Sequence, residues 1–172
     1  MIEDIILVDE YDNPIGTAEK LAAHQNGGKL HRAISVFIFS SQWKLLLQRR
    51  AAEKYHCPGL RSNTCCSHPR PGEISLDAAQ RRLQEEMGMS CPLEEKFIFT
   101  YKAAFDNGLT EHEFDHVFVG VSDAEPKLHP EEADARQYIS PADLIASITK
   151  NRSAFSPRLC VVMEEYYNLL IT

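Results

Sequence analysis

Residues 66–89 read CSHPRPGEISLDAAQRRLQEEMGM. Apolar side chains recur there at three- and four-residue steps, at Leu76, Ala79, Leu83 and Met87. This spacing predicts one buried face of an amphipathic helix, with Ser75 as its N-cap and Gly88 as the residue that ends it. Charged residues fill the opposite face. The stretch therefore predicts a loop, a helix and a second loop.

The rest of the chain predicts strands around this helix and two further helices near the end. Strands are expected at residues 2–8, 33–39, 44–48, 62–67, 97–105 and 110–121. The Asn107-Gly108 dipeptide between the last two is a strong hairpin signal. Ser140-Pro141 and Ser156-Pro157 each combine an N-cap with a first-turn proline, and the second pair precedes a predicted helix over 159–170. We expect one α+β domain over residues 1–172, a sandwich with a mixed sheet.

Composition excludes several broad classes. The 172 residues are 44% hydrophobic and 25% charged, and no apolar run approaches a membrane span. The acidic start, MIEDIILVDE, is unlike a signal peptide, so a cytoplasmic protein is expected. Five cysteines without C-x-x-C spacing argue against a disulfide framework and a zinc ribbon. A net charge of −7 argues against a nucleic-acid or membrane-surface protein. Separately, we expect the protein to be a monomer.

The charged helix face pairs Arg81 with Glu85 and Arg82 with Glu86, each four residues apart. One interpretation is ordinary salt bridging on a solvated surface. The other is a site for metal and phosphate, which the preceding residues favour. Cys66 and His68 stand two apart, so both point to one face of an extended chain. For Cys66 alone, the alternative is a small buried hydrophobic residue.

Glu111 and Glu113 are also two apart, on a predicted strand, and could bind a metal that imidazoles complete. The alternative is an exposed strand edge. His24 and His31, seven apart around Asn26-Gly27-Gly28, are further candidate ligands, although that spacing alone proves nothing.

The pattern Ser67-x5-Glu73-x7-Arg81-Arg82-Leu83-x-Glu85-Glu86-x-Gly88-Met89 resembles the Nudix box, a loop-helix-loop that binds metal–diphosphate complexes. Two positions depart from it. Ser67 stands where the box has Gly, and Arg82 stands where it has Glu. Because Arg82 removes a carboxylate on which hydrolases of this family depend, it argues against diphosphate hydrolysis. An arginine could instead bind a phosphate with two hydrogen bonds.

Nearly the whole chain, roughly residues 3–170, resembles the type I isopentenyl-diphosphate isomerases, which share the Nudix fold. The most specific match is Asn63-Thr64-Cys65-Cys66-Ser67-His68-Pro69. Further matches are Glu19-Lys20, His24, His31, Gln48-Arg49-Arg50, Lys54, Pro58-Gly59 and Glu111-His112-Glu113. The resemblance implies a Nudix-like α/β/α sandwich with a mixed central sheet.

The resemblance also implies two metal ions. One divalent metal, Mn²⁺, Zn²⁺ or Mg²⁺, would be held by the ligand set His24, His31, His68, Glu111 and Glu113. A Mg²⁺ would bind Glu86 together with the diphosphate, and Cys66 is also counted among the metal-binding residues. The phosphate contacts implied are Lys20, Arg50, Lys54 and Arg82.

The reaction implied is a 1,3-allylic proton shift between isopentenyl diphosphate and dimethylallyl diphosphate. Cys66 and Glu113 would flank this prenyl diphosphate, with Tyr101 nearby. In two places an aromatic residue of the family is replaced, at Ser153, where Trp would face the carbocation, and at Cys57. Phe155, Tyr101 or Tyr167 are candidate substitutes. Two other functions stay open, namely a Nudix diphosphohydrolase and a non-catalytic diphosphate-binding protein.

Overall fold

The computed structural model describes residues 3–54 and 56–172. Its strands are β1 (Asp4–Val8), β2 (Pro14–Glu19), β3 (His31–Phe39), β4 (Leu45–Arg50), β5 (Arg61–Ser62), β6 (Cys65–Ser67), β7 (Glu94–Ala104), β8 (Thr110–Val121) and β9 (Ala133–Ile139). Its helices are α1 (Lys20–His24), α2 (Ser75–Met87), α3 (Pro141–Lys150), α4 (Pro157–Val161) and α5 (Tyr167–Leu170), with short helical turns η1 (Arg152–Ala154) and η2 (Val162–Tyr166). Ile2, the predicted start of the first strand, lies outside the described residues.

Strand β3 organises the sheet, because it pairs with β1, β4, β6 and β8. It runs parallel to β8 over its whole length, from His31 opposite Glu113 to Phe39 opposite Val121. Along β6 it runs antiparallel, with Ser35 opposite Cys66. The predicted mixed sheet is therefore confirmed. These pairings place β6 and β8, which are distant from β3 in the sequence, directly beside it.

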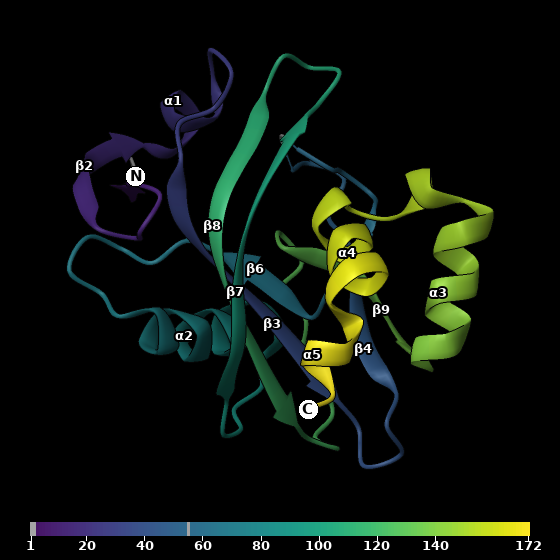
Figure 1. Cartoon of the computed structure of the whole chain (residues 1–172). Helices are drawn as coiled ribbons and strands as arrows, with labels where there is room; N and C mark the ends of the chain where they lie inside the picture. Colours follow the sequence, from purple (N-terminus) through teal and green to yellow (C-terminus); the bar gives the residue numbers. More distant parts are fainter. Residues whose placement is uncertain (1–2, 55) are drawn as a thin grey trace.

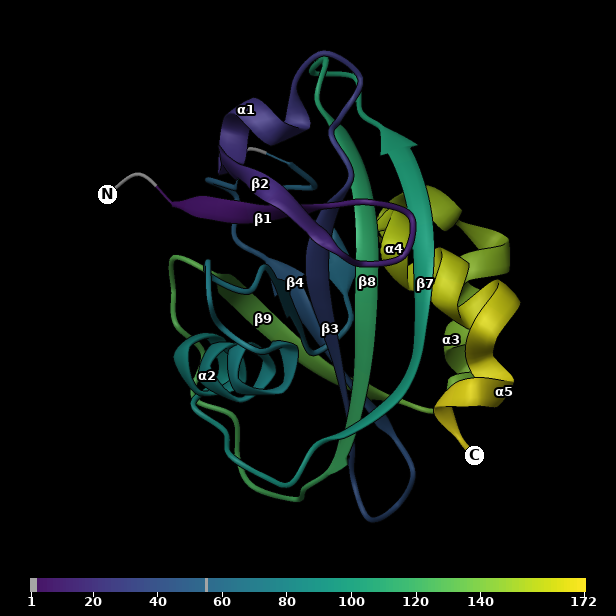
Figure 2. The same cartoon turned by 60° about the vertical axis from the view of Figure 1, so that its left-hand side comes forward.

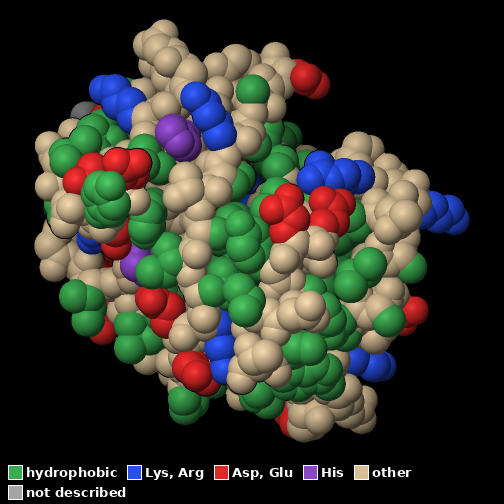
Figure 3. Space-filling model, in the orientation of Figure 1, with side chains coloured by type: hydrophobic (Ala, Val, Ile, Leu, Met, Phe, Trp, Pro, Cys, Tyr) green, Lys and Arg blue, Asp and Glu red, His purple; other side chains and the backbone are tan. Residues whose placement is uncertain are grey.

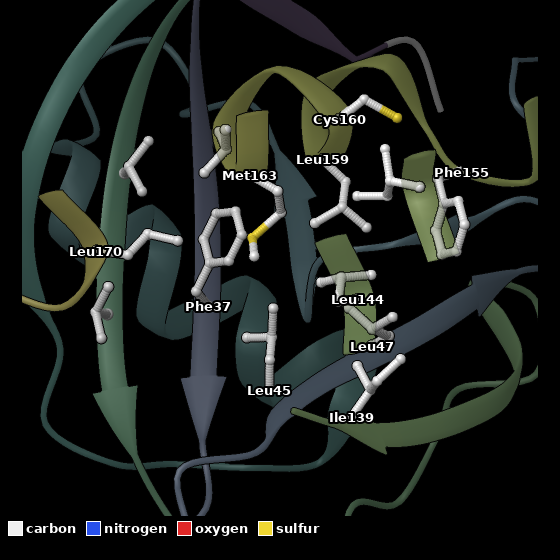
Figure 4. Packing of buried hydrophobic residues seen from close by; sticks show 14 of the residues in the cluster. Phe37, Leu45, Leu47, Ile139, Leu144, Phe155, Leu159, Cys160, Met163 and Leu170 are labelled. Carbon is white, nitrogen blue, oxygen red and sulfur yellow. The ribbon is translucent and has the colours of Figure 1, made fainter. Parts of the chain in front are cut away.

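Helices cover both faces of the sheet, which gives the expected α/β/α sandwich (Figures 1 and 2). On one face α2 packs its apolar residues Ala79, Leu83 and Met87 against Ile34 and Val36 of β3. On the other face α3, α4 and α5 cover a larger cluster. That cluster includes Phe37, Leu45, Leu47, Leu144, Leu159 and Met163 (Figure 4). Side chains that alternate along β3 thus fill the two cores in turn.

Four helix-boundary signals can be checked directly. Gly88 ends α2 as predicted, with a φ of 60° and its N–H donated to Gln84 O. Ser140 and Ser156 accept from the backbone N–H three residues on, so both N-caps are confirmed. The N-cap prediction for Ser75 is wrong. Ser75 is already the first helical residue, and Ile74 precedes it without a side-chain cap.

The sequence missed β2, α1 and β9. Strand β2 contains Pro14 and Gly16 and pairs only with β1, so it is an edge strand with turn-like composition. Strand β9 has few β-branched residues and is defined by its pairing with β4. The predicted helix over 159–170 is divided by η2, a π-helical turn. Its apolar spacing continues through that turn, so the sequence shows no break.

Acidic and basic side chains are interspersed with hydrophobic ones on the face shown in Figure 3. Across the described part of the chain, no helix is both long and apolar enough to cross a membrane.

Candidate active site

Four buried side chains from four segments meet beside β3. His24 ends α1, His31 begins β3, His68 follows β6 and Glu113 lies on β8, and one ligand atom from each lies within 4.8 Å of the others. The His68 Nε2 and His31 Nε2 atoms lie 3.3 and 3.6 Å from Glu113 Oε1. Imidazole nitrogens and a carboxylate oxygen are a donor set that divalent metals accept. The arrangement therefore fits one metal ion.

The imidazoles are oriented by their own backbone. His24 Nδ1 lies 2.6 Å from Lys20 O, and His31 Nδ1 lies 2.7 Å from Lys29 O. A carbonyl can only accept, so each Nδ1 carries the proton and each Nε2 offers a lone pair. His31 Nε2 has no hydrogen-bond partner within residues 3–54 and 56–172. This outer support is the arrangement expected around metal-binding histidines.

Glu111 lies next to this four-residue cluster without being part of it. Its Oε1 atom is 3.1 Å from His56 Nε2, and the Tyr101 hydroxyl donates to its Oε2. The same hydroxyl lies 2.9 Å from Glu113 Oε2. Tyr101 thus ties the two glutamates together, which places all three predicted residues in one site.

Cys66 and the predicted phosphate contacts share a cavity. Its wall is formed by Lys20, Arg50, Lys54, His56, Cys66, Ser67, His68, Arg82, Glu132 and Arg158. The Arg50 Nη1 atom lies 3.6 Å from the Cys66 sulfur. Burial raises the pKa of the Cys66 thiol, although Arg158 and Arg50 oppose the shift. The thiol therefore carries its proton at neutral pH, beside a wall of basic side chains.

Glu86 is buried on the inner face of α2. Its carboxylate accepts from Arg82 Nη2 at 2.7 Å and from Gln48 Nε2 at 3.0 Å. Arg82 also donates to Glu132 at 3.1 Å, and Lys54 pairs with the same Glu132. Glu86 therefore lies behind the cationic wall, outside the histidine cluster.

Four site residues escaped the sequence analysis: His56, Asp115, Glu132 and Arg158. Arg158, at the start of α4, is 4% exposed and donates to Glu113 Oε2. Its Nε atom lies 3.2 Å from Asp115 Oδ2. A basic residue in a first helical turn opposes the helix dipole, and Glu111, Glu113 and Asp115 alternate along one strand. Both features are visible in the sequence and could have identified Arg158 and Asp115 as site residues.

One expectation about the missing aromatic residues needs correction. Ser153 lies exposed in η1, where its hydroxyl donates to Asn151 Oδ1 at 2.8 Å, so a Trp there would not face the substrate. Of the three proposed substitutes, Phe155 packs in the core and Tyr167 packs against it, whereas Tyr101 lies in the site. Cys57 lines a separate small pocket that shares Cys66 and Arg158 with the cavity.

The carboxylates of β8 differ in their surroundings. Burial by itself would raise the pKa of Glu113, but Arg158 and two imidazoles outweigh it and hold that pKa well below the usual range. For Asp115, burial prevails over Arg158 and raises the pKa to about 7. Glu113 is thus an ionised acceptor, as a metal ligand and proton acceptor must be.

Comparisons with known proteins identify the family of the chain. Residues 29–159 match the NUDIX domain family. The "Isopentenyl-diphosphate Delta-isomerase 2" of Aromatoleum aromaticum is 55% identical over 156 residues, covering 91% of this chain and 82% of the relative. The isopentenyl-diphosphate Delta-isomerase of Serratia proteamaculans is 50% identical, covering 96% and 92%.

A solved structure supports the fold alone. The crystal structure of DR0079 from Deinococcus radiodurans superposes with a TM-score of 0.81 at 22% identity, covering 96% of this chain and 99% of that one. With the two relatives at 50% identity or more, these similarities show that the chain belongs to the isopentenyl-diphosphate Delta-isomerase family, built on a NUDIX domain.

Proposed function

We propose that this protein interconverts isopentenyl diphosphate and dimethylallyl diphosphate by protonating one carbon and deprotonating another. One observation carries the proposal. His68 belongs both to the four-residue ligand cluster and to the wall of the cavity that holds Cys66 and the basic side chains. Metal ligands, a protonated thiol and several basic side chains therefore border one space.

The cationic wall fixes the diphosphate end of the substrate. Lys20, Arg50, Lys54 and Arg82 would neutralise the phosphate oxygens, which an acidic protein can do only through such a local cluster. Glu86, which already supports Arg82, would bind a Mg²⁺ that accompanies the diphosphate. This arrangement leaves the hydrocarbon end of the substrate directed toward Cys66 and Glu113.

Cys66 and Glu113 would then move the protons. In the forward direction the terminal carbon of the double bond gains a proton and leaves a tertiary cation at the inner carbon. The methylene carbon on the other side of that inner carbon then loses a proton, so the new double bond joins those two carbons. Cys66 offers a protonated thiol and Glu113 an ionised carboxylate, so the two can act as donor and acceptor. Tyr101 holds the Glu113 carboxylate and presents its ring near the developing cation.

The four-residue ligand cluster would hold a divalent metal, Mn²⁺, Zn²⁺ or Mg²⁺, with Glu111 as a further ligand after a small rotation. Such a metal supplies a fixed positive charge that keeps Glu113 ionised and in place. We further propose that the enzyme works as a cytoplasmic monomer.

The test is an incubation with isopentenyl diphosphate and Mg²⁺, followed by phosphorus and proton NMR. Dimethylallyl diphosphate should appear while both phosphate signals persist. Release of phosphate or pyrophosphate would establish a hydrolase instead, and a bound but unchanged substrate would establish a binding protein. The hydrolase is disfavoured because Arg82 replaces a carboxylate on α2 and forms ion pairs with Glu85, Glu86 and Glu132.

A further inference from the structure

Arg158 lines the cavity but contacts the acids of β8, and no role has been given to it in the binding of diphosphate or metal. Its guanidinium is buried against three acids of β8. It donates to Glu113, its Nε atom lies 3.2 Å from Asp115 Oδ2, and its Nη2 atom lies 3.9 Å from Glu111 Oε1. Its carbon Cζ also lies 5.8 Å from the Tyr101 ring centroid. A buried cation with this many partners is held in a single orientation.

The two oxygens of Glu113 face different groups. The Oε1 atom faces the imidazoles of His68 and His31, at 3.3 and 3.6 Å. The Oε2 atom accepts from Arg158 and lies 2.9 Å from the Tyr101 hydroxyl. Because Arg158 and Tyr101 fix one oxygen, only the other is directed at the ligand cluster. Rotation of the carboxylate would break the hydrogen bond from Arg158 and the contact with Tyr101 in a buried environment.

The charge balance of the acids on β8 also points to Arg158 as the partner of Glu113. Glu111, Glu113 and Asp115 are at most 4% exposed, and together they carry up to three negative charges. One divalent cation leaves such a group negative. Arg158 supplies the remaining positive charge, and Ser35 donates to Asp115 at 2.6 Å, which keeps this third acid away from the cluster. Asp115 and Arg158 thus form a support behind Glu113.

We propose that Arg158 is a positioning residue of the isomerase: it restrains Glu113 so that one carboxylate oxygen binds the metal and the other stays fixed for proton transfer. The inference rests on the proposed function. Arg158 acts on Glu113 and does not bind the diphosphate in this proposal. Loss of Arg158 should therefore lower kcat and leave KM nearly unchanged. A phosphate contact would have the opposite signature.

The test compares Arg158→Met with Arg152→Met, a matched control in η1 whose arginine is exposed and paired with Glu164. Steady-state kinetics should show kcat reduced about 30-fold or more in Arg158→Met, because small displacements of a reacting group have effects of this order. KM should stay within about threefold. Arg152→Met should match the wild type. A kcat within threefold of wild type, or a loss confined to KM, would overturn the inference.

A second readout does not depend on turnover. Mn²⁺ added to each metal-free protein should give an electron paramagnetic resonance spectrum that differs between wild type and Arg158→Met, because a released Glu113 can offer both oxygens. Arg152→Met should reproduce the wild-type spectrum. If wild type is inactive, the proposed function fails while this comparison still decides the role of Arg158. Identical spectra for wild type and Arg158→Met would refute it.

Arg158→Met removes the buried cation that faces three buried acids, which destabilises the fold and can impair folding. Two further variants cover that outcome. Arg158→Lys keeps the charge without the planar fork and should fold with kcat still reduced. Arg158→Met combined with Asp115→Asn removes the charge imbalance and should regain stability without regaining kcat. Full activity in either variant would show that Arg158 only balances charge.

Discussion

Cys66 and Glu113 are the two residues on which the proposed chemistry depends. They reach the site from different strands, β6 and β8, which both pair with β3. His68, two residues after Cys66, contacts Glu113 at 3.3 Å. The donor and the acceptor are therefore positioned by the same central strand.

Cys66→Ala and Glu113→Gln should each reduce kcat by about 10²–10⁴-fold, because each removes a group that transfers a proton. The measurement is the rate of dimethylallyl diphosphate formation, with circular dichroism to confirm folding. Cys91→Ala is the matched control, since Cys91 is a half-buried thiol packed against the α2 core. Ordinary turnover in Cys66→Ala would remove the thiol from the mechanism.

Glu132 has a separate, electrostatic role that can be tested by pH. Although burial opposes the shift, Lys54 and Arg82 lower its pKa from 4.5 to about 2. A carboxylate with a lowered folded pKa stabilises the fold above its unfolded pKa and stops doing so as pH falls through the folded value. Allowing for solvent screening, the contribution is about 1–2 kcal/mol at neutral pH.

Glu132→Gln should therefore unfold more easily than wild type in urea at pH 7. The difference between the two unfolding free energies should shrink as the pH falls from about 4.5 toward 2. A difference that stays constant over this range would show that Glu132 acts through packing and not through charge.

At the residue scale, the resemblance to the isomerase family implied most of the site, and local spacing accounts only for pairs of residues within it. Cys66 and His68 lie two apart on a strand, and Arg82 and Glu86 four apart on a helix. Arg158 was missed because it joins the site only when α4 folds back onto β8, more than forty residues away in the sequence. Ser153 was misplaced for the same reason, since no local pattern shows which side of η1 faces the site.

At the element scale, helix α2 depends on how it ends. Gly88 has a φ of 60°, and a Cβ added there would lie 2.8 Å from Lys127 Cβ and 2.9 Å from Lys127 O. A side chain at Gly88 is therefore opposed both by backbone strain and by a close neighbour. Because α2 carries Arg82 and Glu86, its C-terminal end also bears on the site.

Gly88→Ala should lower the free energy of unfolding by about 2–3 kcal/mol, through strain and displacement of the Lys127 segment. Gly108→Ala is the matched control. It has a φ of 82° with nothing within 4 Å of the added Cβ, so only the strain of about 1 kcal/mol applies. Urea denaturation measures both. Equal losses in the two variants would show that contact with Lys127 does not matter.

Helices with capping residues were predictable, whereas elements defined by pairing were not. Ser140 and Ser156 mark the starts of their helices, because each side chain accepts a hydrogen bond from the backbone N–H three residues later. By contrast, β9 exists because β4 offers an edge, and its own sequence, ADARQYI, has little strand propensity. Tertiary pairing overrode local preference there.

At the scale of the whole molecule, metal binding and stability should be linked. The four-residue ligand cluster joins α1, β3, β8 and the segment after β6, so a bound ion connects four parts of the fold. At a metal concentration of 100 times the dissociation constant, binding adds about 2.7 kcal/mol. For a chain of this size that corresponds to a rise in Tm of roughly 5–10 °C.

Chelation with EDTA should therefore lower Tm by this amount and abolish isomerisation, and added Mn²⁺ should restore both. His31→Gln should lose the metal-dependent shift because Nε2 of His31 faces the cluster. A Tm that responds to metal equally in wild type and His31→Gln would place the ion elsewhere.

The overall architecture was predictable because the order of elements is simple: strands surround one amphipathic helix, and capped helices follow them. The parallel pairing of β3 with β8 was not predictable, because it joins segments some eighty residues apart. That pairing sets His31 opposite Glu113. The site is thus a property of the whole sheet, although its residues come from local motifs.

The most direct test of the proton shift is isomerisation in D₂O, followed by deuterium NMR of the product. Dimethylallyl diphosphate formed by the wild-type enzyme should carry deuterium in the newly formed methyl group, with the diphosphate intact. Cys66→Ala and Glu113→Gln should yield almost no labelled product. Product without deuterium, or phosphate released in its place, would contradict protonation at this site.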